Sequence, residues 1–187
     1  MSGVNDETEV KARVPDAPAF EAALVKAGAT VEFSGEMTDH RFDRKGRLAE
    51  KDEMLRLRVY RPRQGGTRGE LCWKGAVESK GEYRHRQEIE FGVADPWNAL
   101  ALLDRLGFAE SLRIERVVTV FRLGSATLRL ERYPEMDILV EVEGDPSSIE
   151  TAIAATGIPR EEFLPESLPQ FVSRYEKRTG RLARLAT

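Results

Sequence analysis

Five segments of this chain alternate charged and apolar residues with a period of two, and this pattern constrains the fold more than any other feature. In residues 7–14 the odd positions are Glu7, Glu9, Lys11 and Arg13, whereas the even positions are largely apolar. Successive side chains of a β-strand point to opposite faces, so each segment has one charged face and one apolar face. The same pattern recurs in residues 54–60, 83–91, 127–133 and 138–144.

Two arrangements of such strands are consistent with this pattern. An open sheet would turn every charged row to solvent and every apolar row to a core. A closed antiparallel barrel would turn the charged rows inward, with its apolar outer face covered by helices. Periodicity reports the alternation but not which face is inside, so it leaves both arrangements open.

An ordered series of short motifs runs through most of the chain. The first two are ETEVK at 7–11 and DHRFD at 39–43. Six more follow: LRLR at 55–58, LCWKG at 71–75, RQEIE at 86–90, FRLG at 121–124, LRLE at 128–131 and VEVEG at 140–144. In kind and order these motifs resemble those of the CYTH superfamily, the triphosphate tunnel metalloenzymes, in which the first is Glu-x-Glu-x-Lys and the second is Asp-x-Tyr-Phe-Asp, here with Arg41 in place of the tyrosine. The resemblance therefore spans about residues 5–144.

The resemblance implies an α+β fold, a closed or nearly closed antiparallel eight-stranded β-barrel with flanking helices. A chain of 187 residues is long enough for one such domain. We expect a single CYTH-like domain over 1–187, with barrel strands and inserted helices over about 5–144 and C-terminal helices over about 146–180. Asp16, Asp95 and Asp145 each precede a helical pattern and are expected to cap it. The tail at 181–187 is expected to fray.

Acidic residues of the motifs are the expected metal ligands. Mg²⁺ and Mn²⁺ favour hard oxygen donors such as carboxylate, water and phosphate. The resemblance implies that one of these ions is the cofactor and that its ligands are Glu7, Glu9, Glu131, Glu141 and Glu143. Glu131 stands where the family usually has an aspartate. Glu88 and Glu90 match a further family pair, for which a metal-linked role and a structural role are equally open.

Basic residues of the motifs are the expected ligands of a triphosphate. A planar guanidinium can donate two hydrogen bonds to one phosphate. The expected catalytic residues are Lys11, Arg56, Arg58, Lys74 and Arg116. Substrate binding is expected to use the same five cations together with Arg86 and Arg122. Taken singly, Arg13, Arg84 and Arg129 are interpreted as surface residues.

Three functions are compatible with this set of residues. We predict metal-dependent hydrolysis of inorganic or organic triphosphates. The main alternative is a class IV adenylyl cyclase, but the His-Phe pair that often precedes Glu-x-Glu-x-Lys in cyclases is missing from MSGVND. The third is a non-catalytic protein that binds nucleotides or polyphosphate. It stays open because Val118 replaces the second cation of a common Lys-x-Arg pair.

Composition restricts the partners and the compartment. A net charge of −3 gives no overall attraction to nucleic acid or to anionic membranes, so an anionic ligand must be attracted by a local basic cluster. The resemblance implies that this ligand is a small triphosphate-containing molecule. Cys72 is the one cysteine, and the N-terminus has no apolar signal core, which predicts a cytoplasmic protein. The sequence does not fix the oligomeric state, and a homodimer is one of the states it allows.

Two pairs of residues have ordinary structural interpretations. His40 and His85 have no cysteine spaced for a zinc site and are expected in surface or loop positions. Trp73 is expected to pack on the outside of the barrel, and Trp97 is expected in the apolar core face of the helix that begins after Asp95.

Overall fold

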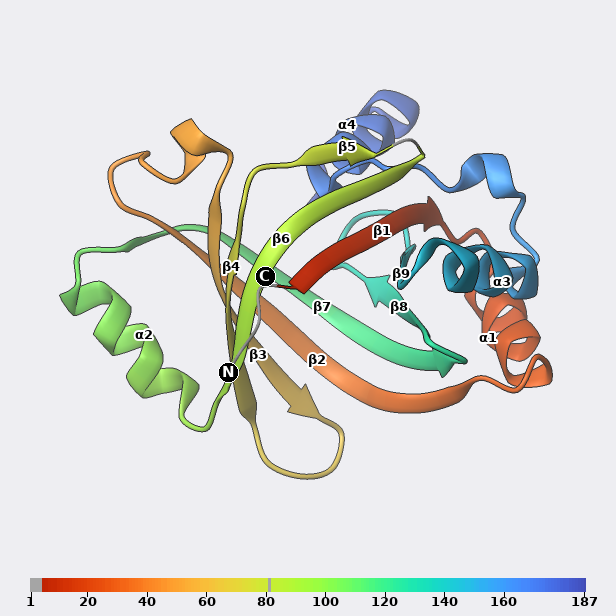
Figure 1. Ribbon diagram of the computed structural model, residues 1–187, viewed down its shortest axis with the longest axis horizontal. Coiled ribbons are helices and arrows are strands. Elements are labelled where there is room, and N and C mark those ends of the chain that lie inside the picture. Colours follow the sequence, from red (N-terminus) through yellow and green to blue (C-terminus); the bar gives the residue numbers. More distant parts are fainter. Residues whose placement is uncertain (1–4, 81) are drawn as a thin grey trace.

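A computed structural model describes residues 5–80 and 82–187, and its elements are labelled in Figure 1. The strands of the described residues are β1 (Asn5–Arg13), β2 (Thr30–Asp43), β3 (Met54–Pro62), β4 (Arg68–Lys74), β5 (Glu78–Lys80), β6 (Tyr83–Val93), β7 (Ala109–Leu123), β8 (Ala126–Arg132) and β9 (Leu139–Glu143). The helices are α1 (Ala17–Lys26), α2 (Pro96–Arg105), α3 (Pro146–Thr156) and α4 (Leu168–Thr179), with short 3₁₀ turns η1 (Ala49–Lys51) and η2 (Arg160–Glu162).

Eight of these strands close into an antiparallel barrel. Their order is β1-β9-β8-β7-β2-β3-β4-β6, and β6 also pairs with β1, which joins the two ends of the sheet. Among the described strands, β5 pairs only with β6 and lies outside this ring. The closed, eight-stranded α+β barrel predicted from the motifs is therefore confirmed.

The charged rows face the inside of the barrel. On β1, Glu7, Glu9 and Lys11 are each less than 9% exposed, and Arg56 and Arg58 of β3 are equally buried. Their strand neighbours point outward and are apolar, so they can be covered by helices. Of the two arrangements that the alternation allowed, the structure has the one in which the charges line a lumen.

Helices cover the outer apolar face. α1 and α3 lie side by side at the right of Figure 1 and pack against the barrel. Their Phe20, Leu24, Ile149 and Ile153 join a core of apolar strand residues that includes Leu128. α2 covers β3 and β4 on the other side. Burying this apolar surface is the main force that holds the outer wall in place.

Aspartate caps fix where three of the helices begin. Asp16, Asp95 and Asp145 each accept hydrogen bonds from backbone N–H groups of the first helical turn, as predicted. In each case a proline occupies the first turn, where its missing N–H costs nothing. α4 instead begins with a capping box between Ser167 and Gln170.

The C-terminal tail does not fray. Arg184 forms two backbone hydrogen bonds with Glu135, and the backbone N–H of Glu115 donates to the carbonyl of Leu185. Thr187 adds backbone and hydroxyl hydrogen bonds to the Glu115 carboxylate. The prediction of a frayed tail was wrong because short-range sequence gives no sign of backbone pairing over such separations.

Three further expectations about single residues were wrong. His40 and His85 lie on β2 and β6 and are buried, where a hydrogen bond to Glu110 and one to Thr8 orient their rings. Trp97 is 52% exposed on α2, and the Arg61 guanidinium lies 5.5 Å from its ring centroid. The expectation for Trp73, half-buried on the outer face of β4, holds.

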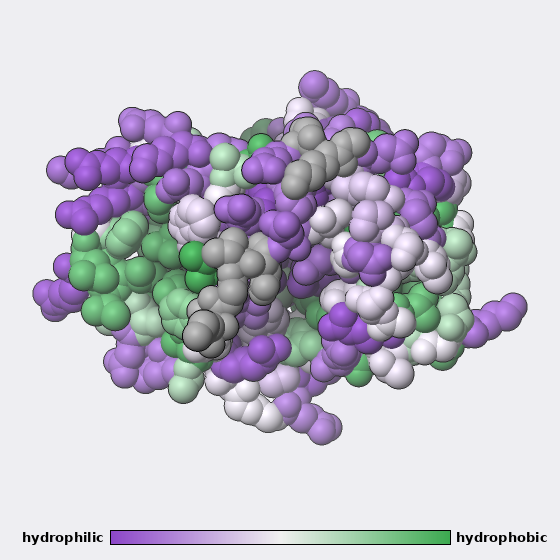
Figure 2. Space-filling model, viewed as in Figure 1, coloured by the Kyte–Doolittle hydropathy of each residue, from purple (hydrophilic) through white to green (hydrophobic). Residues whose placement is uncertain are grey.

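Hydrophilic residues are spread over much of the face shown in Figure 2. Apolar residues gather at its left, in the region of α2, where Leu102 and Leu106 are more than half exposed. None of the helices in the described part of the chain is long and apolar enough to cross a bilayer.

Candidate functional site

The barrel lumen contains two cavities that meet at Glu7, Arg56 and Arg58. The larger one, of about 390 Å³, reaches the start of α4 and is called the helix-side cavity. The smaller one, of about 230 Å³, reaches Tyr60 and Arg68 at the β3–β4 hairpin and is called the hairpin-side cavity. The side chains of Glu7, Arg56 and Arg58 border both.

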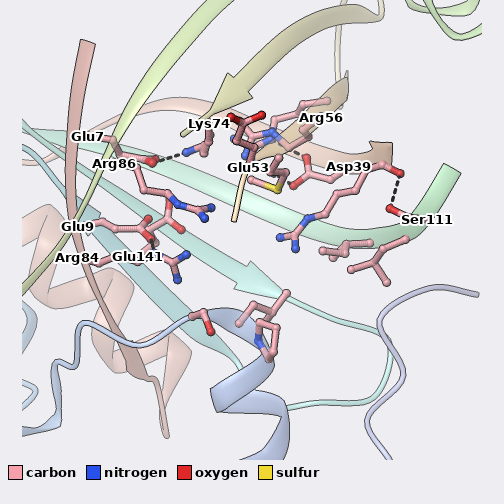
Figure 3. Close-up of a pocket in the computed structure, with 18 of the residues that line it drawn as sticks. Glu7, Glu9, Asp39, Glu53, Arg56, Lys74, Arg84, Arg86, Ser111 and Glu141 are labelled. Carbon is pink, nitrogen blue, oxygen red and sulfur yellow. Dashed lines mark hydrogen bonds and ion pairs between the residues drawn. The ribbon is translucent and has the colours of Figure 1, made fainter. Parts of the chain in front are cut away.

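Three carboxylates from adjacent strands come together in the helix-side cavity. Glu7 and Glu9 extend from β1 and Glu141 from its neighbour β9, as Figure 3 shows. Each contributes one oxygen to a group in which all oxygens lie within 4.8 Å of one another. Lys11 lies between two of them, with Nζ 2.7 Å from Glu9 and 2.7 Å from Glu141. The pairing of β1 with β9 thus creates the carboxylate trio, as we name these three residues.

Charge repulsion within the carboxylate trio shows in its pKa values. Burial and the charge of Glu141 raise the pKa of Glu9 to about 7, although Lys11 opposes the shift. Burial also works against ionisation of Glu7 and Glu141, but Lys74 lowers the pKa of Glu7, and Lys11 and Arg129 lower that of Glu141. A divalent cation would relieve this repulsion, and three hard oxygen donors suit Mg²⁺ or Mn²⁺. The residues present therefore fit such an ion.

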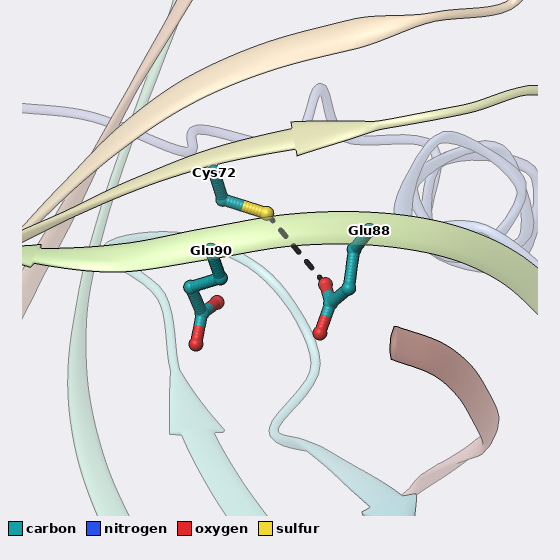
Figure 4. A group of neighbouring side chains, drawn as sticks. All are labelled: Cys72, Glu88 and Glu90. Carbon is teal, nitrogen blue, oxygen red and sulfur yellow. Dashed lines mark hydrogen bonds between the residues drawn. The ribbon is translucent and has the colours of Figure 1, made fainter. Parts of the chain in front are cut away.

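Two further groups involve acidic residues of β6. Glu88 forms a second trio with Glu7 and Glu143, so Glu143 lies near the predicted site but with a different set of neighbours. Glu88 and Glu90 also lie beside Cys72, whose thiol donates to Glu88 over 3.6 Å (Figure 4). Burial raises the pKa of the Cys72 thiol to about 12, which keeps it protonated and a poor metal ligand at neutral pH.

A wall of cations faces the carboxylate trio. Lys74 forms ion pairs with Glu7 and, at 3.1 Å, with Glu88. Arg86 is held by the carboxylate and the backbone carbonyl of Asp52. Because these cations come from β4 and β6, the closure of the barrel is what brings them to the carboxylates of β1.

Asp39 organises the other half of the wall. Its carboxylate accepts hydrogen bonds from Arg58 at 2.7 and 3.1 Å and from Arg116 at 2.8 Å. Burial opposes its ionisation, yet Arg116 and Arg58 hold the pKa of Asp39 well below its usual range. Sequence reasoning did not include Asp39 among the site residues, although it opens the DHRFD motif.

Several guanidinium groups in the lumen keep unused donors. Nε of Arg56, Nε of Arg86 and one terminal nitrogen of Arg116 are buried and have no hydrogen-bond partner within the described chain. Leaving a buried donor unsatisfied is costly, so such atoms mark places where a ligand can accept. Their position around one cavity indicates an anionic ligand.

The family follows from this arrangement together with a sequence comparison. The family model described as "CYTH domain" matches residues 5–156, which includes every barrel strand. The chain belongs to the CYTH domain family. No curated protein sequence matches this CYTH chain.

Solved structures share this CYTH fold at low sequence identity. An adenylate cyclase candidate from Vibrio parahaemolyticus has a TM-score of 0.75 and 17% identity, over 91% of this chain and 99% of that one. The PH1012 protein from Pyrococcus horikoshii has a TM-score of 0.68 and 23% identity, over 88% and 98%. HpAC1 from Hippeastrum, described with a dominant triphosphatase activity, has a TM-score of 0.62 and 19% identity, over 96% and 98%.

Most of the cations that the sequence analysis selected lie together in this CYTH site. The helix-side cavity is lined by Lys11, Arg56, Arg58, Lys74, Arg86 and Arg116. Arg122 instead lines the hairpin-side cavity, where its 40% exposed side chain pairs with Glu32. Glu131 lines the helix-side cavity outside the carboxylate trio and pairs with Arg116 at 2.8 Å.

Two of the three cations interpreted as surface residues line the lumen. Arg84 borders the helix-side cavity, 3.8 Å from Glu9, and half-buried Arg129 pairs with Glu141 in the hairpin-side half. Arg13 is exposed, as expected. Alternation along the strands could have identified Arg84 and Arg129 as residues of the lumen. Arg84 shares a strand face with Arg86, and Arg129 shares a strand face with Glu131.

Proposed function

We propose that the protein hydrolyses the terminal phosphoryl group of a triphosphate with the help of Mg²⁺ or Mn²⁺. One observation carries this proposal: the carboxylate trio faces a wall of arginine and lysine side chains across a single cavity of about 390 Å³. Carboxylates alone would suit many cations, and arginines alone would suit many anions. Both together suit a metal–triphosphate complex, which carries each kind of charge.

The cationic residues bind and orient the phosphate chain. Arg56 and Arg116 offer their unused guanidinium donors to non-bridging oxygens, and Lys74 adds a charge next to Glu7. These groups are fixed before substrate arrives, because Asp39 and Glu131 hold the guanidinium of Arg116 at 2.8 Å each. Fixed donors stabilise charge that develops on the transferred phosphoryl group without a reorganisation cost.

The carboxylate trio has the complementary task. Glu7, Glu9 and Glu141 would hold the ion, which when bound neutralises phosphate charge and positions water. Lys11 keeps Glu9 and Glu141 oriented through its two 2.7 Å contacts. The water oxygen becomes part of the released orthophosphate, and the remaining chain leaves with the bridging oxygen.

A turnover screen tests the proposal and separates it from its two alternatives. Purified protein is incubated with tripolyphosphate or ATP and with Mg²⁺ or Mn²⁺, and orthophosphate, pyrophosphate and cAMP are measured. Orthophosphate that is lost in Arg116→Gln but kept in Arg13→Gln, a change at an exposed arginine, is the expected result. cAMP with pyrophosphate would instead indicate a cyclase. Tight binding without any product would indicate a non-catalytic binding protein.

The remaining parts of the proposal concern the partner and the compartment. A small triphosphate is the proposed partner, because the binding donors lie inside the barrel rather than on an open surface. Cys72 is free and buried, which fits the reducing cytoplasm that we propose for this protein.

A further inference from the structure

Arg41 is a cation of the lumen that the motif comparison does not assign to the site. It lies on β2, paired across the strands with Arg56 and with Leu112, and its side chain lines the helix-side cavity. It also marks a departure from the family pattern, since Arg41 stands where the Asp-x-Tyr-Phe-Asp segment has tyrosine.

Among the described residues, Arg41 differs from every other cation of this cavity in having no carboxylate partner. The other seven cations that line it each form at least one ion pair: Lys11, Arg56, Arg58, Lys74, Arg84, Arg86 and Arg116. Within residues 5–80 and 82–187, the Arg41 guanidinium forms no ion pair and no hydrogen bond, and its Nε is buried without an acceptor. Asp39, whose charge acts on Arg41, already accepts hydrogen bonds from Arg58 and Arg116.

The surroundings of Arg41 make this charge unfavourable in the ligand-free protein. Burial lowers the pKa of Arg41 to about 10, and the like charges of Arg56 and Arg116 add to the effect, whereas Asp39 opposes it. Even for a partly buried side chain such as that of Arg41, a charge without a partner among the described residues is unfavourable. An anion brought by a ligand would supply the missing partner.

The strand order places Arg41 across the lumen from the carboxylate trio. In the ring β1-β9-β8-β7-β2-β3-β4-β6, β2 is four strands from β1 in either direction, so it lies on the opposite wall. A ligand that contacts both must span the barrel. The phosphoryl group at Arg41 would then be the one farthest from the metal ligands.

The other end of this wall is apolar. Val118 pairs with Gly35, and it packs with Met37, Tyr60 and Val120 in a buried cluster. Gly35 is six residues from Arg41 along β2, which corresponds to about 20 Å. The apolar cluster around Val118 therefore supplies no positive charge in place of the second cation of the family pair. The unpaired charge of Arg41 lies at the other end of this wall, near α4.

We propose that Arg41 binds the phosphoryl group of the substrate that lies farthest from the carboxylate trio, and that it thereby selects chains of three phosphates over shorter ones. This inference rests on the proposed function, because it assigns a position to one end of the same substrate. Arg41 acts here as a binding residue for an inorganic or organic triphosphate. On this proposal pyrophosphate, which has one phosphoryl group fewer, does not reach Arg41 while it contacts the metal ligands.

The test compares the wild type with Arg41→Gln and Arg41→Tyr, the second of which restores the tyrosine of the family motif. Calorimetry gives the Kd of tripolyphosphate and of pyrophosphate with Mg²⁺ present, and turnover assays give KM and kcat. Loss of one hydrogen-bonded charge should weaken tripolyphosphate binding by about 10- to 100-fold. Pyrophosphate binding should change by less than about threefold. Arg13→Gln, a change at an exposed arginine, is the matched control and should behave as the wild type.

Thermal melting separates ligand binding from a structural role. Arg41→Gln removes an unpaired charge, so the ligand-free variant should melt at the same temperature as the wild type or higher. The rise in Tm on adding tripolyphosphate should shrink, because that rise reports binding to the folded state. A ligand-free variant that melts well below the wild type would show that Arg41 supports the fold.

Other outcomes bear on the two proposals separately. An unchanged Kd for tripolyphosphate in Arg41→Gln, or equal losses for tripolyphosphate and pyrophosphate, would overturn the role of Arg41 and leave hydrolysis intact. Wild-type protein that binds tripolyphosphate without releasing orthophosphate would refute hydrolysis, and the Kd values would still test Arg41.

Discussion

Replacing Glu9 by glutamine tests whether the carboxylate trio is strained without metal. Burial and the neighbouring charge of Glu141 raise the pKa of Glu9 from 4.5 to about 7. The folded protein therefore holds this proton more tightly than the unfolded chain does. The stabilisation from protonated Glu9 is complete below about pH 4.5 and is lost as the pH rises to about 7.

The size of the effect follows from the shift. A rise from 4.5 to about 7 corresponds to about 3 kcal/mol, at 1.36 kcal/mol per unit. Glu9 is 8% exposed, so solvent screening reduces this figure little. Glutamine keeps the shape of protonated Glu9 and does not ionise. Relative to Glu9→Gln, metal-free wild type should therefore lose about 3 kcal/mol of stability between pH 4.5 and pH 8.

Urea unfolding at a series of pH values, with a chelator present, measures this difference. Glu36→Gln is the matched control, because Glu36 is an exposed carboxylate on β2 outside both cavities. Its stability should follow the wild type at every pH. Parallel curves for wild type and Glu9→Gln from pH 4.5 to pH 8 would refute the reasoning about charge repulsion in the trio. Added Mg²⁺ should reverse the order of stability above pH 7, because only the wild type offers the full set of charges.

Three further predictions concern other parts of the lumen. Glu7→Gln should weaken Mg²⁺ affinity by at least about tenfold, with partial recovery of turnover at excess Mg²⁺, as metal titrations of activity would show. Asp39→Asn should cost about 3–5 kcal/mol in urea unfolding at pH 7, because it leaves the buried Arg58 and Arg116 guanidinium groups without their shared carboxylate; a loss under about 1 kcal/mol would contradict the role given to Asp39. Arg122→Ala should change the free energy of unfolding by less than about 1 kcal/mol, since Arg122 forms an exposed pair with Glu32. If Arg122→Ala changed KM as much as Arg56→Ala does, the hairpin-side cavity would lie on the substrate path.

The sequence by itself determined which residues share a face. Alternation in residues 7–11 places Glu7, Glu9 and Lys11 in one row, and the backbone geometry of a strand allows no other result. Helix starts at Asp16, Asp95 and Asp145 were equally local, since a cap depends on a few neighbouring backbone groups. With the motif series added, the closed barrel and most of the cations of the helix-side cavity could be predicted.

Only the tertiary structure decided which row is inside and which charges are paired. Hydrogen bonds between β1 and β6 close the ring, and this closure turns Arg84 and Arg129 into the lumen rather than to solvent. The pairing of Asp39 with Arg116 joins residues 77 positions apart, which no local pattern reports. The lack of a partner for Arg41 among the described residues was also decided by the tertiary structure. Whether a cation has a partner depends on which carboxylates of the whole lumen are still free once the barrel has closed.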